Sequence, residues 1–127
     1  MSRLAPACLA ILIAGPAGGA EPDLVNGRIL FAQCGTCHAL AADKAKGKAG
    51  PHLAGLFGRT AGTVKGYTYS PAMRAKGIIW NETTLDIYLT KPKAYVPGTT
   101  MIYSGLRRKS DRHDLIAFLK DVLRNTR

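Results

Sequence analysis

Residues 34–38 read Cys-Gly-Thr-Cys-His, and this stretch decides how the rest of the chain is interpreted. Two cysteines at this spacing suit a disulfide, a redox-active thiol pair or one half of a zinc site. A thioredoxin-like pair follows a strand in a βαβ unit, and no such pattern precedes Cys34. A zinc site needs a second pair of ligands, whereas His52 and His113 are isolated in the sequence. The histidine directly after the second cysteine favours a fourth interpretation.

The order Cys-x-x-Cys-His is the attachment sequence of a c-type haem. Thiols at positions 34 and 37 can form thioethers with the two vinyl groups at one edge of the porphyrin. The next residue, His38, then directs its imidazole at the iron from below the ring. The motif therefore predicts one haem c, bound covalently through Cys34 and Cys37.

The first twenty residues have the pattern of a secretory leader. Arg3 supplies a positive charge, Leu4 to Ala14 is uncharged and mostly apolar, and Ala17 to Ala20 supplies small residues for cleavage. We therefore expect residues 1–20 to be a cleaved signal peptide, residues 21–127 to be the mature domain, and the periplasm to be its compartment. The apolar stretch is shorter than the ~18 residues of a membrane span, which disfavours an uncleaved anchor.

The composition is that of an ordinary globular domain with a strong positive charge. The chain has 127 residues, of which 46% are hydrophobic and 20% charged, and a net charge of +10. A length of ~100–150 residues suits one domain, and the composition excludes a disordered chain. The charge alone leaves nucleic acid, an anionic membrane and an acidic protein open as partners.

Caps and apolar periodicity predict two helices in the first part of the domain, and no convincing strand appears. A helix capped by Asp23 is expected to turn apolar side chains toward a core, namely Leu24, Ile29 or Phe31. A short helix is expected from the Ser70 cap to the terminal Gly77. The Gly-rich residues 46–66 contain several apolar side chains, so they are expected to wrap around the cofactor and not to form a free linker.

Two further helices are predicted in the second part. One is capped by Asn81, ended by Pro92, and carries an i, i+3, i+4 apolar set of Leu85, Tyr88 and Leu89. The last is expected to begin at a Ser110 cap and to present one apolar stripe, made of Leu115, Phe118, Leu119, Val122 and Leu123.

The sixth position of the haem iron has several candidates. His113 falls outside the apolar stripe of the last helix and is interpreted as a solvated surface residue, and His52 lies too near the attachment site to cross the ring easily. Met73 lies in the short helix and is better explained as a core or haem-packing methionine. Met101 ends an irregular loop with Pro and Gly, which can present a thioether without competing helix geometry. Such a ligand raises the reduction potential.

With these motifs in place, the chain resembles the class I cytochromes c of the mitochondrial cytochrome c and bacterial cytochrome c2 branch. The resemblance runs from about Gly27 to Leu123. Its motifs are Cys34 to His38, Gly50 to Arg59, Gly66 to Ser70, Lys76 to Trp80, and Tyr95 to Ile102. It implies an all-α class I cytochrome c fold, with helices and loops wrapped around one haem, in which Gly27 lets the first helix cross the last closely.

The resemblance also implies roles for single residues. His38 and Met101 match the two axial ligands, and the carbonyl of Pro51 matches the acceptor for the N–H of the proximal imidazole. Four residues match positions that surround or hydrogen-bond the haem propionates: Arg59, Tyr69, Ser70 and Trp80. Two match hydroxyls near the methionine: Tyr88 and Thr99.

Two positions depart from the pattern of this branch. Met73 stands where mitochondrial members usually carry an asparagine that forms hydrogen bonds around a propionate and a buried water. The methionine therefore predicts a drier, altered hydrogen-bond network here. His52 replaces another usual polar residue and is expected at the surface.

The resemblance implies a soluble, monomeric electron carrier that is not an enzyme. Its partners would present acidic faces: a bc1-type complex as donor, and a terminal oxidase of a respiratory chain, a reaction centre or a reductase as acceptor. The basic residues that best match a docking ring are Lys48, Lys93, Arg107 and Arg108. The alternative, a haem-c peroxidase or ligand-binding sensor, needs an open sixth position, against which the loop 97–101 argues. Nucleic acid is not expected as a partner, because no binding motif is recognisable.

Overall fold

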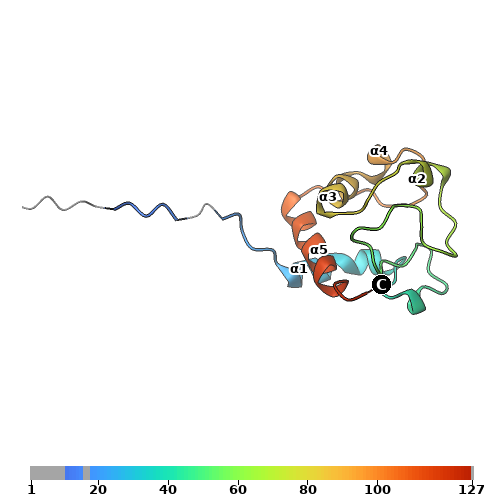
Figure 1. Ribbon diagram of the computed structural model, residues 1–127, viewed down its shortest axis with the longest axis horizontal. Coiled ribbons are helices and arrows are strands. Elements are labelled where there is room, and N and C mark those ends of the chain that lie inside the picture. The colour runs from blue at the N-terminus through green and yellow to red at the C-terminus, as the bar shows by residue number, and fades with distance from the viewer. Residues whose placement is uncertain (1–10, 16–17, 127) are drawn as a thin grey trace, which may run out of the picture.

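Helices joined by long loops form the part of the chain that the computed structural model describes, residues 11–15 and 18–126 (Figure 1). In chain order these are α1 (Leu24–Gly35), the 3-10 helix η1 (Ala42–Lys44), α2 (Pro71–Ala75), α3 (Glu82–Thr90), α4 (Pro92–Tyr95) and α5 (Lys109–Val122). Within these residues the only β-type pairing is an isolated antiparallel bridge between Thr60 and Ile79. The predicted all-α class is therefore confirmed.

Helices α1 and α5 cross in close contact at Gly27, as expected. Gly27 is buried, and a Cβ placed on it would lie 2.7 Å from the Cβ of Phe118 and would also overlap the backbone of Asp114. The rings of Phe31 and Phe118 meet one turn further along, with centroids 5.7 Å apart. The absence of a side chain at one position thus sets how closely the two helices approach.

The start of α1 is tied to α5 by polar contacts. Asp23 caps α1, because its carboxylate accepts hydrogen bonds from the backbone N–H groups of Val25 and Asn26. The carboxylate of Asp114 in turn accepts from the Asp23 N–H and from the Asn26 side-chain amide, both at 2.8 Å. The predicted Asp23 cap is therefore confirmed, and it is continuous with a network across the helix crossing.

The face that α1 turns toward the core differs in part from the prediction. Leu24 is 43% exposed and Ile29 is 67% exposed, so neither belongs to the core. The inward positions are Gly27, Leu30, Phe31 and Cys34, at the spacing of one helical face. The close crossing at Gly27 explains the correction, because it fixes the rotation of α1 and turns Leu24 and Ile29 to solvent.

The helices α2 and α3 begin where the caps predict. The Ser70 hydroxyl accepts a hydrogen bond from the Met73 N–H at 3.1 Å, and Pro71 occupies the first helical position. Asn81 caps α3 in a reciprocal capping box with Thr84. The three predicted core residues of α3, Leu85, Tyr88 and Leu89, are all buried, and Met73 is a core residue as expected.

Helix α5 starts earlier than predicted. It begins at Lys109, so Ser110 lies inside the first turn and is not the N-cap; Arg108 occupies that position without a side-chain cap. Across this first turn, Arg108 Nε forms an ion pair with the Asp111 carboxylate at 3.2 Å. The stripe residues Leu115, Leu119 and Leu123 are buried, and Ile116, which the prediction omitted, is buried with them.

The loop residues 46–66 pack on the core and do not form a free linker. Leu56 and Ala61 belong to the buried cluster, and Leu53 and Phe57 pack against it. The chain before α1, where it is described, is extended and points away from the domain (Figure 1). Most of the predicted hydrophobic part of the leader, including Cys8, lies outside the described residues. No helix in the described ranges combines the length and the apolar character that crossing a bilayer requires.

Candidate haem site

The attachment motif lies at the C-terminal end of α1. Cys34 is in the last turn, and the backbone N–H groups of Cys37 and His38 both donate to its carbonyl oxygen, at 3.1 and 2.9 Å. This turn brings the two cysteines and the histidine together. Both cysteines are free thiols, which leaves them available for thioether bonds. Burial, with a smaller effect of the neighbouring Cys37, raises the pKa of Cys34 to about 11.

The imidazole of His38 is held in one orientation. Its Nδ1 lies 2.7 Å from the carbonyl oxygen of Pro51, so that nitrogen carries the proton and donates it, and Nε2 keeps its lone pair. The hydrogen bond expected at Pro51 is therefore present. Burial lowers the pKa of His38, and the bond to Pro51 offsets only part of this effect. A neutral imidazole with a free Nε2 is the form that binds a metal.

Gly50 is a residue of this site that the sequence analysis missed. A Cβ placed on Gly50 would lie 2.5 to 3.0 Å from three atoms of the His38 ring, so only glycine lets the chain lie flat against the imidazole. Its N–H donates to the Cys37 carbonyl at 2.9 Å, which fastens the Gly50 segment to the attachment motif. Its place directly before Pro51 was the available signal, because a Gly-Pro pair marks a constrained turn.

Met101 is surrounded by the two hydroxyls that the sequence predicts near it. The Tyr88 hydroxyl lies 3.6 Å from the Met101 sulfur and 3.4 Å from the Thr99 hydroxyl. The Thr99 hydroxyl also accepts from the Met101 N–H, at 3.3 Å. Helix α3 carries Tyr88 in the core and so supports the loop that carries Met101. Burial raises the pKa of Tyr88, so the phenol stays protonated and can donate.

The four residues predicted near the propionates are held mainly by backbone contacts. Arg59 donates to the carbonyls of Ala54, at 2.5 Å, and His52, at 3.1 Å. The Tyr69 hydroxyl accepts from the Val64 N–H at 3.2 Å. Ser70 is the cap of α2, and the buried ring of Trp80 packs 5.1 Å from that of Tyr88. These contacts fix the loops around the core, and a role toward the propionates stays a prediction.

His52 is only half exposed, so the expectation of a surface residue is wrong in part. Its Nδ1 is buried without a hydrogen-bond partner among the described residues. Burial is the main cause that lowers the pKa of His52, with the nearby Arg59 guanidinium acting in the same direction. The His52 carbonyl accepts a hydrogen bond from Arg59, which holds the backbone against the domain at this position.

The residues present fit a haem c. Two free thiols, a neutral imidazole with an open Nε2 and a thioether are the donor set that such a group requires. The hydroxyl of Tyr103 is buried without a partner in the described part of the chain, and burial and the nearby Cys34 raise its pKa. An unpaired buried hydroxyl next to the attachment cysteine is consistent with a bound group that the protein atoms alone do not supply.

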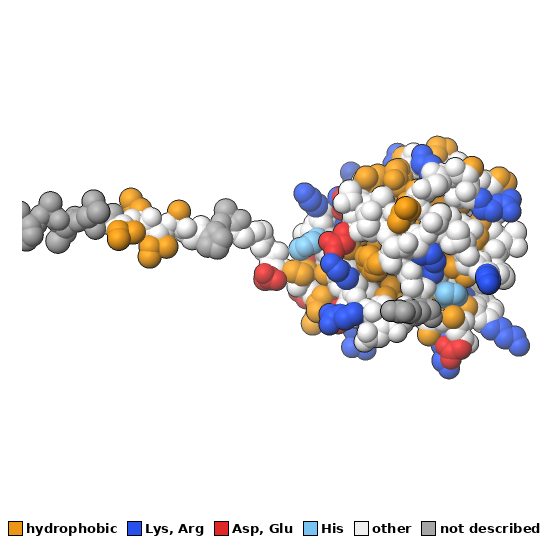
Figure 2. Space-filling view, viewed as in Figure 1, with side chains coloured by type: hydrophobic (Ala, Val, Ile, Leu, Met, Phe, Trp, Pro, Cys, Tyr) orange, Lys and Arg blue, Asp and Glu red, His pale blue; other side chains and the backbone are white. Residues whose placement is uncertain are grey.

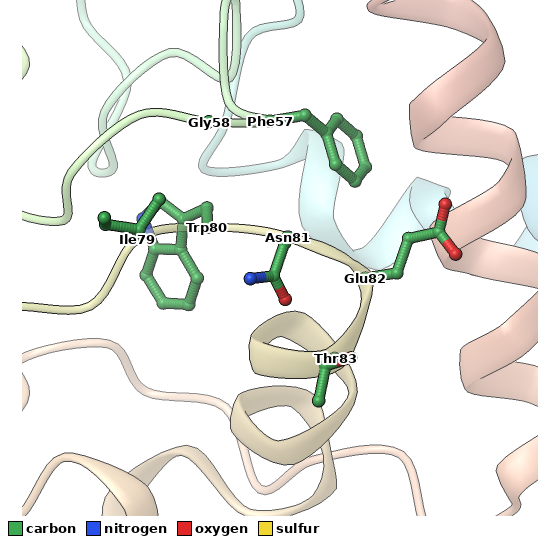
Figure 3. Close-up of a pocket in the computed structure, with 7 residues that line it drawn as sticks. All are labelled: Phe57, Gly58, Ile79, Trp80, Asn81, Glu82 and Thr83. Carbon is green, nitrogen blue, oxygen red and sulfur yellow. The ribbon is translucent and has the colours of Figure 1, made fainter.

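Two surface hollows of the described part of the domain lie away from this donor set. One, of about 350 Å³, has Phe57 on one wall and the start of α3 at Asn81 and Glu82 on the other (Figure 3). Another, of about 750 Å³, lies along α5 beside Leu24 and Phe57. Neither contains Cys34, His38 or Met101, so neither is a candidate for the haem.

The four basic residues predicted for docking fall into two groups. Lys48 donates to the Gly35 carbonyl at 2.8 Å, at the end of α1, and Arg108 pairs with Asp111. Lys93 and Arg107 are exposed and form no ion pair within the described ranges. Figure 2 shows Lys and Arg side chains around most of the visible outline of the domain, with few acidic ones between them.

A helical domain with a Cys-x-x-Cys-His turn, a bonded proximal histidine and a supported methionine loop is the architecture of a covalent haem protein. The profile of the family described as Cytochrome c matches residues 24–123, and the chain belongs to this family. It therefore binds one haem c covalently through Cys34 and Cys37 and serves as a single-haem electron carrier, as predicted.

The relatives agree with this assignment. The chain is 49% identical to a cytochrome c of Stellaria longipes over 105 residues, covering 82% of this chain and 96% of that protein. It is 49% identical to a cytochrome c of Gibberella zeae over 106 residues, covering 83% and 96%. It is 43% identical to the cytochrome c2 of Blastochloris viridis over 112 residues, covering 88% and 87%.

Proposed function

We propose that this protein carries electrons in the periplasm, with His38 and Met101 as the two axial ligands of its haem iron. The observation that carries the proposal is that both side chains are held by hydrogen bonds, His38 by Pro51 and Met101 by Tyr88. Ligands that are held in place by the protein change little between the ferric and ferrous states. Small reorganisation favours electron transfer, and an occupied sixth position disfavours peroxidase or sensor chemistry.

The ferric spectrum of the purified holoprotein tests the ligand assignment. A low-spin spectrum with a weak near-infrared band from sulfur-to-iron charge transfer is expected, and the Met101→Ala variant should lose this band. A high-spin ferric spectrum in the parent protein would instead favour the peroxidase or sensor alternative. Met73→Leu is the matched control, because it removes another buried thioether without touching the proposed ligand.

The pattern of the N-terminal residues supports a cleaved leader and export to the periplasm. We infer that residues 1–20 are removed on export and that the mature domain comprises residues 21–127. The similarity to a cytochrome c2 supports the periplasm, whereas the plant and fungal relatives do not distinguish it from other compartments. N-terminal sequencing of the protein from the native host is expected to begin at Glu21, and a chain beginning at Met1 would contradict the proposal.

The partners proposed are redox proteins with acidic docking faces, namely a bc1-type donor and an oxidase, reaction centre or reductase as acceptor. The high positive charge and the free side chains of Lys93 and Arg107 support this choice. Association rates with such partners should fall steeply as salt is raised. Lys93→Gln and Arg107→Gln should lower the rates more than Arg124→Gln, whose side chain is paired with Asp121. Rates independent of ionic strength would contradict electrostatic docking.

A further inference from the structure

Arg112 of α5 is a buried cation that none of the sequence motifs explains. Its side chain is only 8% exposed, and its Nε donates to the Asp86 carboxylate of α3 at 2.7 Å. Its Nη1 donates to two successive backbone carbonyls, those of Leu106 at 2.9 Å and Arg107 at 3.0 Å. One guanidinium therefore joins α5, α3 and the chain segment that follows Met101.

The segment held by Arg112 has few backbone hydrogen bonds. From Met101 to Gly105 no hydrogen bond between backbone groups is formed within the described ranges. The next backbone bond runs from the Leu106 N–H to the Leu89 carbonyl at the end of α3, at 2.8 Å. Gly105 lies against the Thr90 carbonyl, so closely that a Cβ would not fit there. The position of the methionine segment is thus set at its C-terminal end by α3 and by Arg112.

The other end of the loop is anchored independently. Val96 is 1% exposed, and its N–H donates to the carbonyl of the buried Pro92 at 2.9 Å. The Thr99 N–H donates to the Val96 carbonyl at 3.0 Å, which closes a tight turn before Met101. Without the Arg112 contacts, the loop would keep its backbone hydrogen bonds at Val96 and Thr99 on one side. On the other side it would keep only the backbone bond of Leu106.

The chemistry of the side chain suits this position. A guanidinium is planar and presents several N–H groups in a fixed fork, so it can bond a carboxylate and two carbonyls at once. A lysine presents a single charged centre and cannot reproduce this pattern. Removing the cation altogether would leave the carbonyls of Leu106 and Arg107 with fewer donors in a partly buried place, which favours their movement toward water.

We propose that Arg112 is a positioning residue for the thioether of Met101: it holds the methionine segment closed over the iron. The inference rests on the proposed role of Met101 as axial ligand. Without Arg112 the segment spends more time open, and an external ligand then competes more successfully for the sixth position. The apparent affinity for that ligand scales with the fraction of open molecules.

Cyanide binding to the ferric holoprotein measures this fraction. Arg112→Gln is expected to bind cyanide at least about tenfold more tightly than the parent and to weaken the near-infrared band. The cyanide affinity of Arg112→Lys should fall between those of the parent and Arg112→Gln. A lysine can restore the ion pair with Asp86, but it cannot also donate to both carbonyls. Arg124→Gln removes an exposed ion pair with Asp121 of the same helix and should leave cyanide affinity unchanged.

A second comparison separates positioning from loss of stability. Leu119→Ala opens a cavity in the core at α5 without removing an anchor of the loop, and urea unfolding places it on the same stability scale. If Leu119→Ala tightens cyanide binding as much as Arg112→Gln for an equal loss of unfolding free energy, the proposal is overturned.

Two further outcomes are distinct. If Arg112→Gln does not fold, Asp86→Asn tests the same contact more mildly, and an unchanged cyanide affinity in that variant overturns the proposal. A parent protein without a near-infrared band, which binds cyanide as tightly as the Met101→Ala variant, would contradict the ligand assignment itself. A parent with the band and an Arg112→Gln variant of unchanged affinity would contradict only the role of Arg112.

Discussion

Gly50 lies directly against the imidazole of His38, with room for no side chain between them. A Cβ on Gly50 would lie 2.5 Å from Cε1 and 2.8 Å from Nδ1 of the ring. The same ring is bonded through Nδ1 to the Pro51 carbonyl, at 2.7 Å. Two consecutive residues therefore fix the plane of the proximal ligand, one by contact and the other by a hydrogen bond.

Replacing Gly50 by alanine is expected to push the imidazole out of this orientation. Overpacking of this kind costs ~1–3 kcal/mol, so the free energy of unfolding should fall by about that amount. The g values of the ferric low-spin EPR spectrum should shift, because they depend on the plane of the axial imidazole. Ala49→Ser adds an atom at the exposed neighbouring position and serves as the control. An unchanged EPR spectrum in Gly50→Ala would show that the contact does not orient the ring.

Gly27→Ala should separate α1 from α5. An alanine normally favours a helix over glycine by ~1 kcal/mol, but here its Cβ would meet Phe118 at 2.7 Å and overlap the α5 backbone. We expect a net loss of about 2 kcal/mol or more in the free energy of urea unfolding. Gly35→Ala, in the same helix, adds a Cβ at an ordinary 3.4 Å from Phe31 and should be neutral or stabilising. Equal stability changes in the two variants would contradict the close crossing.

Tyr88→Phe is expected to lower the reduction potential. The hydroxyl lies 3.6 Å from the Met101 sulfur, and donation to that sulfur withdraws electron density from the ligand, which favours ferrous iron. A hydrogen bond worth ~1 kcal/mol corresponds to about 40 mV for a one-electron couple. Tyr95→Phe is the control, because Tyr95 packs near Tyr88 without bonding the sulfur. A potential that is unchanged or raised in Tyr88→Phe would refute this argument.

Stability should fall in acid through Asp114. Its pKa lies below that of an ordinary aspartate because the Asn26 amide and the Asp23 N–H donate hydrogen bonds to the ionised carboxylate, and His113 acts in the same direction. A carboxylate with a lowered folded pKa stabilises fully above the unfolded pKa of ~3.9, and this contribution is lost as pH falls through the folded value. Unfolding free energies measured from about pH 5 to pH 2 should therefore decline less in Asp114→Asn than in the parent. An equal decline in Asp114→Asn and in the parent would contradict this account.

Met73→Asn should change the haem environment. Met73 is 9% exposed within the core cluster, so an asparagine there brings a polar amide into an apolar place. The burial of an amide without partners costs ~1–3 kcal/mol, and water drawn in with it should alter the reduction potential or the rate of ligand exchange. Met73→Leu keeps the site dry and should resemble the parent. If the reduction potential and the rate of ligand exchange of Met73→Asn both equal the parental values, the prediction that Met73 keeps this part of the haem environment dry is wrong.

Local signals predicted much of the helical structure. Asp23, Ser70 and Asn81 cap helices as expected, because the hydrogen bond of a cap involves only residues two or three positions apart. The predicted start of α5 is wrong because its cap makes no such local hydrogen bond. Arg108 takes the cap position while its side chain pairs with Asp111, and a cap without a hydroxyl or carboxylate has no local signal.

The side-chain environments were less predictable than the elements. Leu24 and Ile29 are exposed because the crossing with α5 sets the rotation of α1, and no residue of α1 alone contains that information. Lys48 and Arg108, whose role in docking stays a prediction, also make contacts within the protein that no local pattern indicates. From the sequence, Arg112 would be expected at the surface. It is buried because Asp86 of α3 and the carbonyl of Leu106 both bond its guanidinium in the folded chain.

The cofactor chemistry can be predicted from the order of residues, because Cys34, Cys37 and His38 are neighbours and their spacing matches one edge of a porphyrin. The capped helices can be predicted in the same way, because their capping bonds are local. The contacts between separate segments follow only from the folded chain. These are the contacts of Gly50 and Pro51 with the His38 ring, and the hydrogen bonds of Tyr88 and Arg112 to the Met101 segment. These contacts join residues from 5 to 13 positions apart, and the bond of Arg112 to Asp86 spans 26, so the packing of the chain and not a local pattern brings them together.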